Sequence, residues 1–422
     1  MVQTQGAEPA ERPLLLVIAT GPQRYREYVF ASMAARYRIH LLNTAAPTWE
    51  QPYLTGWTVV PSTDADVLII AARDLAAQLP VSGVLSWDEA RILQAALVAE
   101  DLGLPGTGSQ TVLRCRDKHQ TRLALAAAGV PQPAFAVVGT VDEALAAAEK
   151  IGYPVVLKPR AAAASYGVVL VRDAGELAAR FTFADEATVP HAPRYPQAVL
   201  VEEYLDAPEI SIDSVVFQGR VEPLFVAHKE IGFAPYFEEI GHRVSNADPV
   251  LADPDALKVL HDTHAALGFT SGWTHAEFKL TPQGLKVIEV NGRLGGDLIP
   301  YLGMLASGID PSLAAADVAC GRKPGTTAQR AKVGGVRFFY PEHDDTVIES
   351  VEFDAGTLPP QTDQVVPLAE PGSVVSPPPN GLVSGRIAFA TVVADTPQAC
   401  IQALDQIATT LTVRIAHAGA QR

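Results

Sequence analysis

The sequence has 422 residues, 48% of them hydrophobic and 19% charged, which allows two or three globular domains with full cores. A formal net charge of −15 argues against nucleic acid or an anionic membrane as the partner. Cys115, Cys320 and Cys400 are widely spaced and show no metal-binding pattern, so we expect reduced thiols and a cytoplasmic protein.

The first 13 residues are polar and contain proline, a composition that predicts a flexible tail. The apolar run LLLVIA that follows, residues 14–19, is too short for a signal sequence or a membrane span. No later segment approaches about 18 uninterrupted apolar residues. We therefore expect a soluble protein that is not exported.

Residues 14–112 are expected to form an α/β domain, because strand-like and helix-like segments alternate there. The strands are predicted at 14–19, 38–43, 66–72 and 81–87, and the helices at 25–37 and 88–103. Such alternation is typical of a parallel, doubly wound sheet. The turn after the first strand, TGPQRY, has one glycine and therefore lacks a dinucleotide-binding fingerprint.

The middle of the chain, residues 113–325, begins with a predicted helix over 112–129 that ends at Gly129. A compact α+β unit is expected over about residues 130–200, closing with a loop at 182–197 that is rich in Pro, His and Thr. Further strands are predicted at 198–205, 209–218 and 275–291, and a further helix at 306–321. Residues 326–422 are rich in strands and turns and end in a helix at 396–411, which predicts a small α+β module.

A hairpin is predicted where HAEFKL (275–280) and KVIEVN (286–291) are joined by TPQGL. A three-residue loop would pair Thr281 with Leu285 and so place Glu277 directly opposite Glu289. Two like charges in this position repel each other by roughly 4 kcal/mol at an effective dielectric near 20. The sequence must therefore contain something that offsets this repulsion.

A divalent cation held by Glu277, Glu289 and the carbonyl oxygen of Asn291 is one explanation, because all-oxygen ligation suits Mg²⁺ or Mn²⁺. An exposed charge ladder neutralised by Lys279 on the same face is the alternative. The metal hypothesis leaves coordination positions open for phosphate oxygens.

Two other stretches are candidates for nucleotide contacts. Lys158 ends an apolar strand beside the small-residue loop PRAAAASYG, where backbone and ammonium could surround phosphates. The strand VLVEEYLDAPE could offer backbone groups to an adenine edge and a later carboxylate to ribose hydroxyls. The alternatives are an exposed strand-end lysine beside a linker and an edge strand that ends in acids.

Together these features resemble the ATP-grasp superfamily of carboxylate–amine ligases, over about residues 118–321. The most specific match is a glutamate followed, after eleven residues, by E-x-N-x-R, present as Glu277, Glu289, Asn291 and Arg293. The resemblance implies the ATP-grasp fold, with a lid subdomain at about 130–200 and a central grasp domain. It also implies ATP and two Mg²⁺ or Mn²⁺ ions as cofactors. The implied ATP-binding residues are Lys118, Lys158, Ser165, Gly167, Glu202, Glu203, Tyr204, Leu205 and Glu209.

Within the superfamily, FEEIGHRVSN (237–246) and VNGRLGGDLIPYLGMLASGID look most like the L-amino-acid ligase group, which makes dipeptides. The residues implied on the substrate side are Glu239, His242, Arg293, Gly295, Gly296 and Asp297. We hypothesise that Asp297 selects a substrate with a cationic group, whereas His242 could instead be a purely structural histidine. The sequence departs from the family pattern in two places, an alanine-rich phosphate loop and Glu203 where the hinge often has lysine.

The implied reaction has two steps. A carboxylate attacks the γ-phosphate of ATP to give an acyl phosphate and ADP, and an amine then displaces the phosphate. Lys158 would share the phosphate charge, Arg293 would stabilise the oxyanion, and His242 would act beside the transferred group. The partners are thus a small-molecule carboxylate and amine, and a homodimer would be common for the family.

Three rival functions stand beside amide ligation. They are a biotin-dependent carboxylase, a ligase that joins an amino acid to a non-amino-acid partner, and a nucleotide-binding regulatory subunit. The sequence has no biotinyl AMKM motif, which argues against a carboxylase that carries its own biotin. The presence of Arg293 argues against a pure binding protein, because binding alone needs no residue for a transition state.

Overall fold

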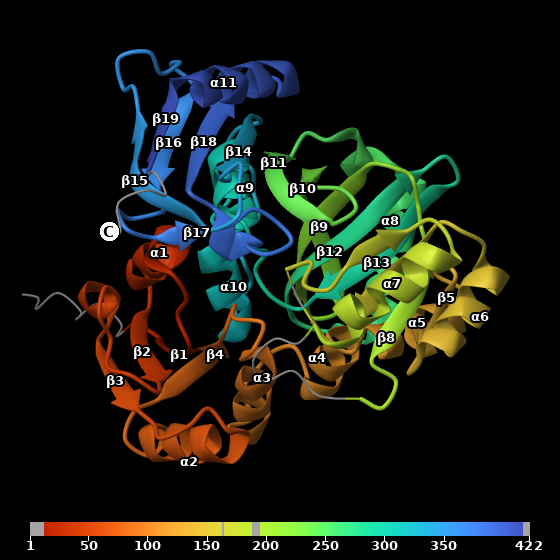
Figure 1. Cartoon of the computed structure of the whole chain (residues 1–422). Coiled ribbons are helices and arrows are strands. Elements are labelled where there is room, and N and C mark those ends of the chain that lie inside the picture. The colour runs from red at the N-terminus through yellow and green to blue at the C-terminus, as the bar shows by residue number, and fades with distance from the viewer. Residues whose placement is uncertain (1–11, 163, 188–194, 417–422) are drawn as a thin grey trace, which may run out of the picture.

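Four β-sheets organise the chain in the computed structural model, which describes residues 12–162, 164–187 and 195–416 (Figure 1). The predicted tail therefore lies almost entirely outside the described residues. The combination of parallel and antiparallel sheets with covering helices confirms the mixed α/β and α+β fold class. Within the described residues, every helix falls short of the length and apolar content needed to cross a bilayer.

The first sheet is parallel and has the strand order β3-β2-β1-β4. Its strands are β1 (Leu14–Ile18), β2 (Arg38–Asn43), β3 (Gly56–Val59) and β4 (Val81–Leu85), and its helices are α1 (Gln23–Ala34), α2 (Ala65–Ala76) and α3 (Ile92–Asp101). Alternate β1 side chains enter two cores, Leu15 and Val17 on the side of α1, and Leu16 and Ile18 on the side of α2 and α3. Helices thus cover both faces, as expected for a doubly wound sheet (Figure 1).

The strand predicted at 66–72 is wrong, because this segment lies within helix α2. Leu68 and Ala72 are buried on one helical face, four residues apart, whereas Ile70 between them is 58% exposed. A short continuous apolar run has no clear period, so the sequence alone does not distinguish a strand from a helix here.

The single helix predicted over 112–129 is also wrong, because two helices occupy this segment. They are α4 (Ser109–Arg116) and α5 (Lys118–Ala127). Asp117 between them has an extended backbone, and its carboxylate accepts the N–H groups of His119 and Gln120 as the N-cap of α5. This break places Lys118 in the first turn of a new helix.

The third region is a four-stranded antiparallel sheet with the order β5-β8-β6-β7. Its elements are β5 (Phe135–Val138), α6 (Val141–Ile151), β6 (Val155–Pro159), β7 (Val169–Val171), α7 (Ala174–Asp185) and β8 (Val199–Glu203). The loop predicted at 182–197 overlaps the last turn of α7, and residues 188–194 of it lie outside the described part of the chain.

The largest sheet has eight strands in the order β13-β12-β9-β10-β11-β14-β18-β16. Its strands are β9 (Glu209–Phe217), β10 (Arg220–Gly232), β11 (Glu238–Ser245), β12 (Gly272–Thr281), β13 (Gly284–Asn291), β14 (Val333–Phe339), β16 (Thr362–Pro367) and β18 (Ala388–Ala394). Helices α5 and α8 (Pro254–Leu267) pack on one face, and α9 (Ile299–Ser307) and α10 (Pro311–Ala319) pack on the other. Three strands from the predicted C-terminal module thus continue the sheet of the middle region.

The helix predicted at 306–321 is replaced by α9 and α10. Gly308 ends α9 in the left-handed conformation, with φ of 76°, and the Asp310 carboxylate caps α10. The final helix is confirmed as α11 (Pro397–Thr410), which covers β14 and β18 at the top of Figure 1. A small sheet with the order β17-β15-β19 completes this end, formed by β15 (Thr346–Phe353), β17 (Val374–Val375) and β19 (Leu411–Ile415).

The hairpin of β12 and β13 places Glu277 directly opposite Glu289, as predicted. The predicted loop is wrong, however, because Thr281 pairs with Gly284 rather than with Leu285. A register shift between Glu277 and Phe278 compensates for the shorter loop and restores the expected pairing. Ile288, which directly precedes Glu289, is the residue left without a partner on β12 by this shift.

Candidate active site

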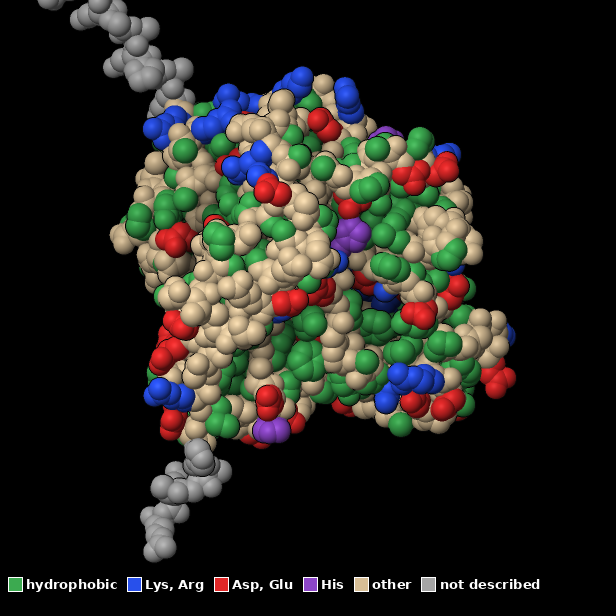
Figure 2. Space-filling view, turned by 90° about the horizontal axis from the view of Figure 1, so that it is seen from above, with side chains coloured by type: hydrophobic (Ala, Val, Ile, Leu, Met, Phe, Trp, Pro, Cys, Tyr) green, Lys and Arg blue, Asp and Glu red, His purple; other side chains and the backbone are tan. Residues whose placement is uncertain are grey.

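Two adjoining cavities lie where the small antiparallel sheet, the eight-stranded sheet and the parallel domain meet. The first has a volume of about 150 Å³, and the second has a volume of about 400 Å³. Both are lined by Ala164, Ser165, Glu239, Glu277 and Arg293, so these residues stand at the junction. The face of the molecule seen in Figure 2 mixes acidic, basic and apolar side chains around its hollows.

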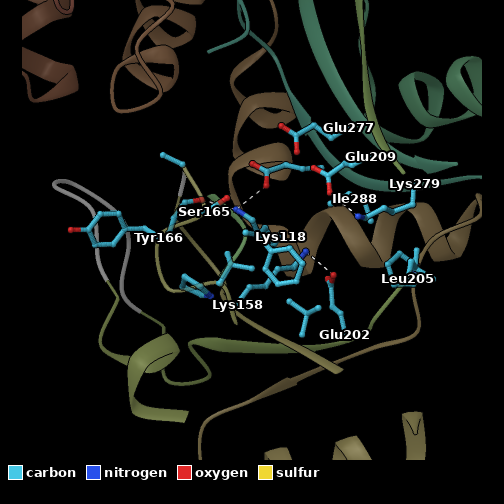
Figure 3. Close-up of a pocket in the computed structure, with 18 of the residues that line it drawn as sticks. Lys118, Lys158, Ser165, Tyr166, Glu202, Leu205, Glu209, Glu277, Lys279 and Ile288 are labelled. Atoms are coloured by element: carbon cyan, nitrogen blue, oxygen red, sulfur yellow. Dashed lines mark hydrogen bonds and ion pairs between the residues drawn. The ribbon is translucent and has the colours of Figure 1, made fainter. Parts of the chain in front are cut away.

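The first cavity contains most residues predicted to bind ATP. Lys118, Lys158, Ser165, Glu202, Glu203, Tyr204, Leu205 and Glu209 all line it. Figure 3 shows Lys118 between the strand that carries Lys158 and the sheet that carries Glu277. The cavity is therefore bounded by two sheets, with cationic side chains between them.

Lys158 is the second-last residue of β6 and is buried against Glu202, with 2.6 Å between its ammonium and the carboxylate. Arg122, which the sequence analysis missed, binds the same carboxylate at 2.7 and 3.1 Å. Burial lowers the pKa of Lys158 to about 8, while Arg122 and Lys158 overcome the effect of burial and lower the pKa of Glu202 to about 2. The Glu202 side chain is thus fully engaged, so only backbone groups at this position are available to a ligand.

The residues after Glu202 continue out of the sheet along the cavity. The carboxylate of Glu203 is occupied by Lys286 at 3.2 Å and by the N–H of Ala134 at 3.1 Å. Tyr204 and Leu205 follow the end of β8 and line the cavity wall. This arrangement agrees with a segment that would recognise a base through its backbone rather than its acidic side chains.

Lys118 connects the small-residue loop to the metal-ligand candidates. Its ammonium donates to the carbonyl of Ala162 at 2.6 Å and lies 3.2 Å from Glu289. The adjacent Asp117 holds Arg160 in a bidentate ion pair, with both distances 2.7 Å. Asp117 and Lys118, at the break between α4 and α5, therefore both bind the loop that follows β6.

The loop itself departs from a glycine-rich design. Ala164 and Ser165 both have φ of 55°, a left-handed conformation that is unfavourable for residues with a Cβ atom. Gly167, which was predicted to bind ATP, does not line either cavity. A Cβ atom at Gly167 would lie 2.3 Å from the Ala187 side chain, so packing accounts for this glycine.

Glu277, Glu289 and Asn291 line the first cavity together, as predicted from the hairpin. Two carboxylates and an amide oxygen form a hard, all-oxygen donor set, which suits Mg²⁺ or Mn²⁺. Cations of the protein already lie beside both carboxylates, Lys118 beside Glu289, and His275 and Lys229 beside Glu277. The donor set of the residues present nevertheless fits a divalent cation.

His275 is a second residue that the sequence analysis missed. Its two ring nitrogens lie 2.9 Å from Asp213 and 3.3 Å from Glu277, and the side chain is almost fully buried. Burial disfavours the charged ring, but the two carboxylates outweigh burial and raise the pKa of His275 to about 9. A protonated His275, which does not line the first cavity, thus orients the Glu277 carboxylate that does.

Lys229 on β10 occupies the centre of a cluster of three carboxylates. Its fully buried ammonium lies 2.7 Å from Glu239, 2.9 Å from Glu277 and 3.3 Å from Glu209. Burial opposes its charge, but the carboxylates raise the pKa of Lys229 well above its usual value. The three acids are close enough together to share one metal ion, and the ammonium already supplies the positive charge there.

The substrate-side residues gather around the second cavity. Glu239, Arg293, Gly296 and Asp297 line it, whereas His242 lies fully buried behind Glu239 and Asp297, at 3.2 and 3.6 Å. Burial disfavours the charged ring, but these two carboxylates prevail and raise the pKa of His242. His242 can therefore influence the cavity only through its acidic neighbours.

Asp297 requires a correction to the hypothesis that it selects a cationic substrate. Arg386 binds both of its carboxylate oxygens, at 2.6 and 2.9 Å, and also contacts Glu238 at 3.3 Å. Despite burial, Arg386 and His242 lower the pKa of Asp297 far below its usual range. Because the protein itself supplies the cations, Asp297 is not free to bind a substrate amine.

The remaining predicted residues occupy different surroundings. Arg293 is held by Glu89, 2.6 Å away, an acid of the N-terminal domain that the sequence analysis did not select. Gly295 lines neither cavity, and a Cβ atom there would lie 2.8 Å from the ring of His275. Gly295 therefore allows close packing on His275, and Gly296 alone of the pair borders the second cavity.

Comparison with known proteins assigns this arrangement to a family. The ATP-grasp domain family matches residues 151–300. The uncharacterized protein y4rH of Sinorhizobium fredii is 30% identical over 395 residues, which cover 91% of this chain and 79% of that protein. The chain belongs to the ATP-grasp superfamily.

Other relatives of this ATP-grasp protein are ligases. Alanine–anticapsin ligase of Bacillus subtilis is 28% identical over 331 residues, covering 69% of this chain and 68% of that protein. The crystal structure of an L-amino acid ligase from Bacillus licheniformis matches with a TM-score of 0.79 at 22% identity, over 97% of this chain and all of the other. The protein is accordingly a member of the ATP-grasp carboxylate–amine ligases and resembles the L-amino-acid ligases.

Proposed function

We propose that this ATP-grasp ligase activates an amino acid as an acyl phosphate and joins it to an amine, giving an amide or dipeptide, ADP and phosphate. The junction of the two cavities is the observation that carries the proposal. A reaction that transfers a phosphoryl group and then an acyl group needs a nucleotide compartment and a substrate compartment that meet at one point, and Arg293, Glu277 and Glu239 border both cavities.

In the proposed nucleotide compartment, Lys118 and Lys158 bind phosphate oxygens, together with Ser165 and the loop around it. The backbone of residues 202–205 holds adenine, and Glu209 accepts hydrogen bonds from the ribose hydroxyls. The burial of Lys158 supports its part of the assignment, because an ammonium removed from water interacts more strongly with a phosphate.

Glu277, Glu289 and Asn291 would hold divalent cations, and we propose two ions. When bound, Mg²⁺ neutralises phosphate charge and orients the phosphate oxygens. The chain contributes the orientation of the ligands, because His275 and Lys229 fix Glu277 from two sides.

The chemistry then follows from the positions of the charges. The substrate carboxylate oxygen attacks the γ-phosphorus, ADP leaves, and the resulting acyl phosphate is attacked at carbon by the amine nitrogen. The amine loses a proton and phosphate departs with the former carboxylate oxygen. Arg293, fixed by Glu89, stabilises the tetrahedral oxyanion at the junction. His242 contributes as a positioning residue by setting the charge on Glu239 and Asp297.

The relatives support an amino acid as one substrate, since one of them is named for the joining of alanine to anticapsin. Three unpaired cysteines fit a reducing compartment, so we propose that the ligase acts in the cytoplasm on small molecules. A homodimer is proposed by analogy with the family.

The proposed function is tested by ATP-dependent phosphate release over a matrix of carboxylates and amines, with products identified by mass spectrometry. Release that requires both a carboxylate and an amine is expected. Glu289→Ala should reduce the rate by about 100-fold or more, because a metal ligand is lost. Glu352→Ala, which removes an exposed carboxylate from β15, is the matched control. Substantial activity in Glu289→Ala would refute the metal assignment, and release that needs bicarbonate alone would refute amide ligation.

A further inference from the structure

Arg26 on α1 is a cation of the second cavity that lacks a counter-ion. Its guanidinium is half-buried, lines this cavity and donates two long hydrogen bonds, both 3.4 Å, to the carbonyl of Gly295. No carboxylate among the described residues lies within ion-pair distance of it. The other two arginines of the cavity are neutralised, Arg293 by Glu89 and Arg386 by Asp297.

The acids of the cavity wall are mostly committed to other cations. Lys229 holds Glu239 and Glu277, and Arg386 holds Glu238 and Asp297. Asp88 has no ion-pair partner among the described residues, and one of its oxygens accepts the N–H of Ala90. Among the described residues, the wall therefore presents one charge of each sign without an ion-pair partner, the combination that an amino acid carries.

The position of Arg26 relative to the junction decides which substrate it faces. The carboxylate that reacts with ATP must lie near Arg293, which borders both cavities. Arg26 borders only the second cavity and is absent from the lining of the nucleotide cavity. An anion on Arg26 therefore belongs to a part of the substrates that does not receive phosphate.

We propose that Arg26 binds the carboxylate of the amine substrate, so that the second substrate is an amino acid or another amine that carries an acidic group. This inference rests on the proposed amide ligation. Guanidinium binds a carboxylate through two parallel hydrogen bonds, whereas a neutral carboxamide offers one acceptor and no charge. Burial lowers the pKa of Arg26, and Tyr28 and the more distant Asp297 oppose this effect only in part. Arginine stays protonated, so a bound anion supplies the counter-ion that no described carboxylate provides at ion-pair distance.

The test compares each proteinogenic amino acid with its own carboxamide as the amine substrate. A carboxamide has no carboxylate to activate, so it can only act as the amine. Wild-type enzyme is expected to use the free acids and to show a KM at least about 10-fold higher for the carboxamides. Arg26→Gln should raise the KM for the acids by about 10-fold or more and leave the KM for the carboxamides unchanged.

Arg24→Gln is the matched control, because Arg24 is an exposed arginine on the same helix that does not line the second cavity. It should leave both KM values unchanged. Equal use of acids and carboxamides by the wild type, or an equal effect of Arg26→Gln on both, would overturn the inference while leaving amide ligation intact. Failure of every substrate pair to release phosphate would instead count against the proposed function.

Discussion

Lys229→Met is expected to destabilise the protein more than any other single lysine change at the site. Methionine keeps the length of the side chain but removes an ammonium that lies within 3.3 Å of Glu209, Glu239 and Glu277. Each acid then keeps another cationic neighbour, Lys279, His242 and His275 respectively. Removing one partner from a buried ion pair typically costs about 3–5 kcal/mol, because the remaining charge is left without compensation. The side chain of Lys229 is fully buried, so solvent does not screen the loss.

The measurement is urea unfolding at pH 7.5, followed by tryptophan fluorescence and circular dichroism to check that both signals change together. Lys258→Met is the control, since Lys258 is exposed on α8 and its ion-pair partner among the described residues is Asp262 on the same helix. Its unfolding free energy should stay within about 0.5 kcal/mol of wild type. An equal effect of the two substitutions would refute the assignment of Lys229 as the counter-ion of the acidic cluster.

The pH dependence of the same experiment gives a second check. In the variant, the acids have lost their shared ammonium, so burial raises their pKa values relative to wild type and protonation restores stability as the pH falls. In wild type, Lys229 and His275 lower the pKa of Glu277 despite its burial, so stability is lost as the pH falls. The difference between the two proteins should therefore shrink from pH 7 to pH 5, and a constant difference would contradict a charge effect.

Two further predictions concern pH. Burial lowers the pKa of Lys158 to about 8, so the KM for ATP should rise between pH 7 and pH 9 in wild type and should be flatter in Lys158→Arg; parallel profiles would exclude Lys158 as the titrating group. Burial disfavours the charged ring of His275, but Asp213 and Glu277 outweigh burial and raise its pKa from 6.5 to about 9. The stabilisation that this shift provides is fully present below pH 6.5 and is lost as the pH rises through 9. The unfolding free energy should accordingly fall by up to about 3 kcal/mol over this range, and His275→Gln should remove the fall.

Much of the fold was predictable because it depends on local patterns. Alternating strands and helices indicated the parallel sheet, and the two short apolar runs around TPQG indicated the hairpin. The errors occurred where a local pattern has two structural solutions. Asp117 looks like an interior helix residue until its carboxylate caps a new helix, and residues 66–72 fit a strand as well as a helix.

The candidate site was predictable only as far as it lies on the hairpin. The opposition of Glu277 and Glu289 follows from the register of neighbouring strands, which the sequence encodes. The partners of these acids come from other strands and helices, as with Lys229 on β10, so spacing along the chain contains no signal for them. Arg386 is an extreme case, because it follows β16 in the chain yet binds Asp297 in the middle region. Its contact depends on the tertiary fold alone.

The two cavities draw on different lengths of the chain. Every described residue that lines the first cavity lies between Lys118 and Arg293, whereas the second cavity uses side chains from Thr20 to Arg386. Substitutions near either end of the chain can therefore reshape the substrate compartment without touching the residues assigned to ATP. In evolutionary terms, the ligase can exchange one substrate for another while its energy-supplying half stays constant.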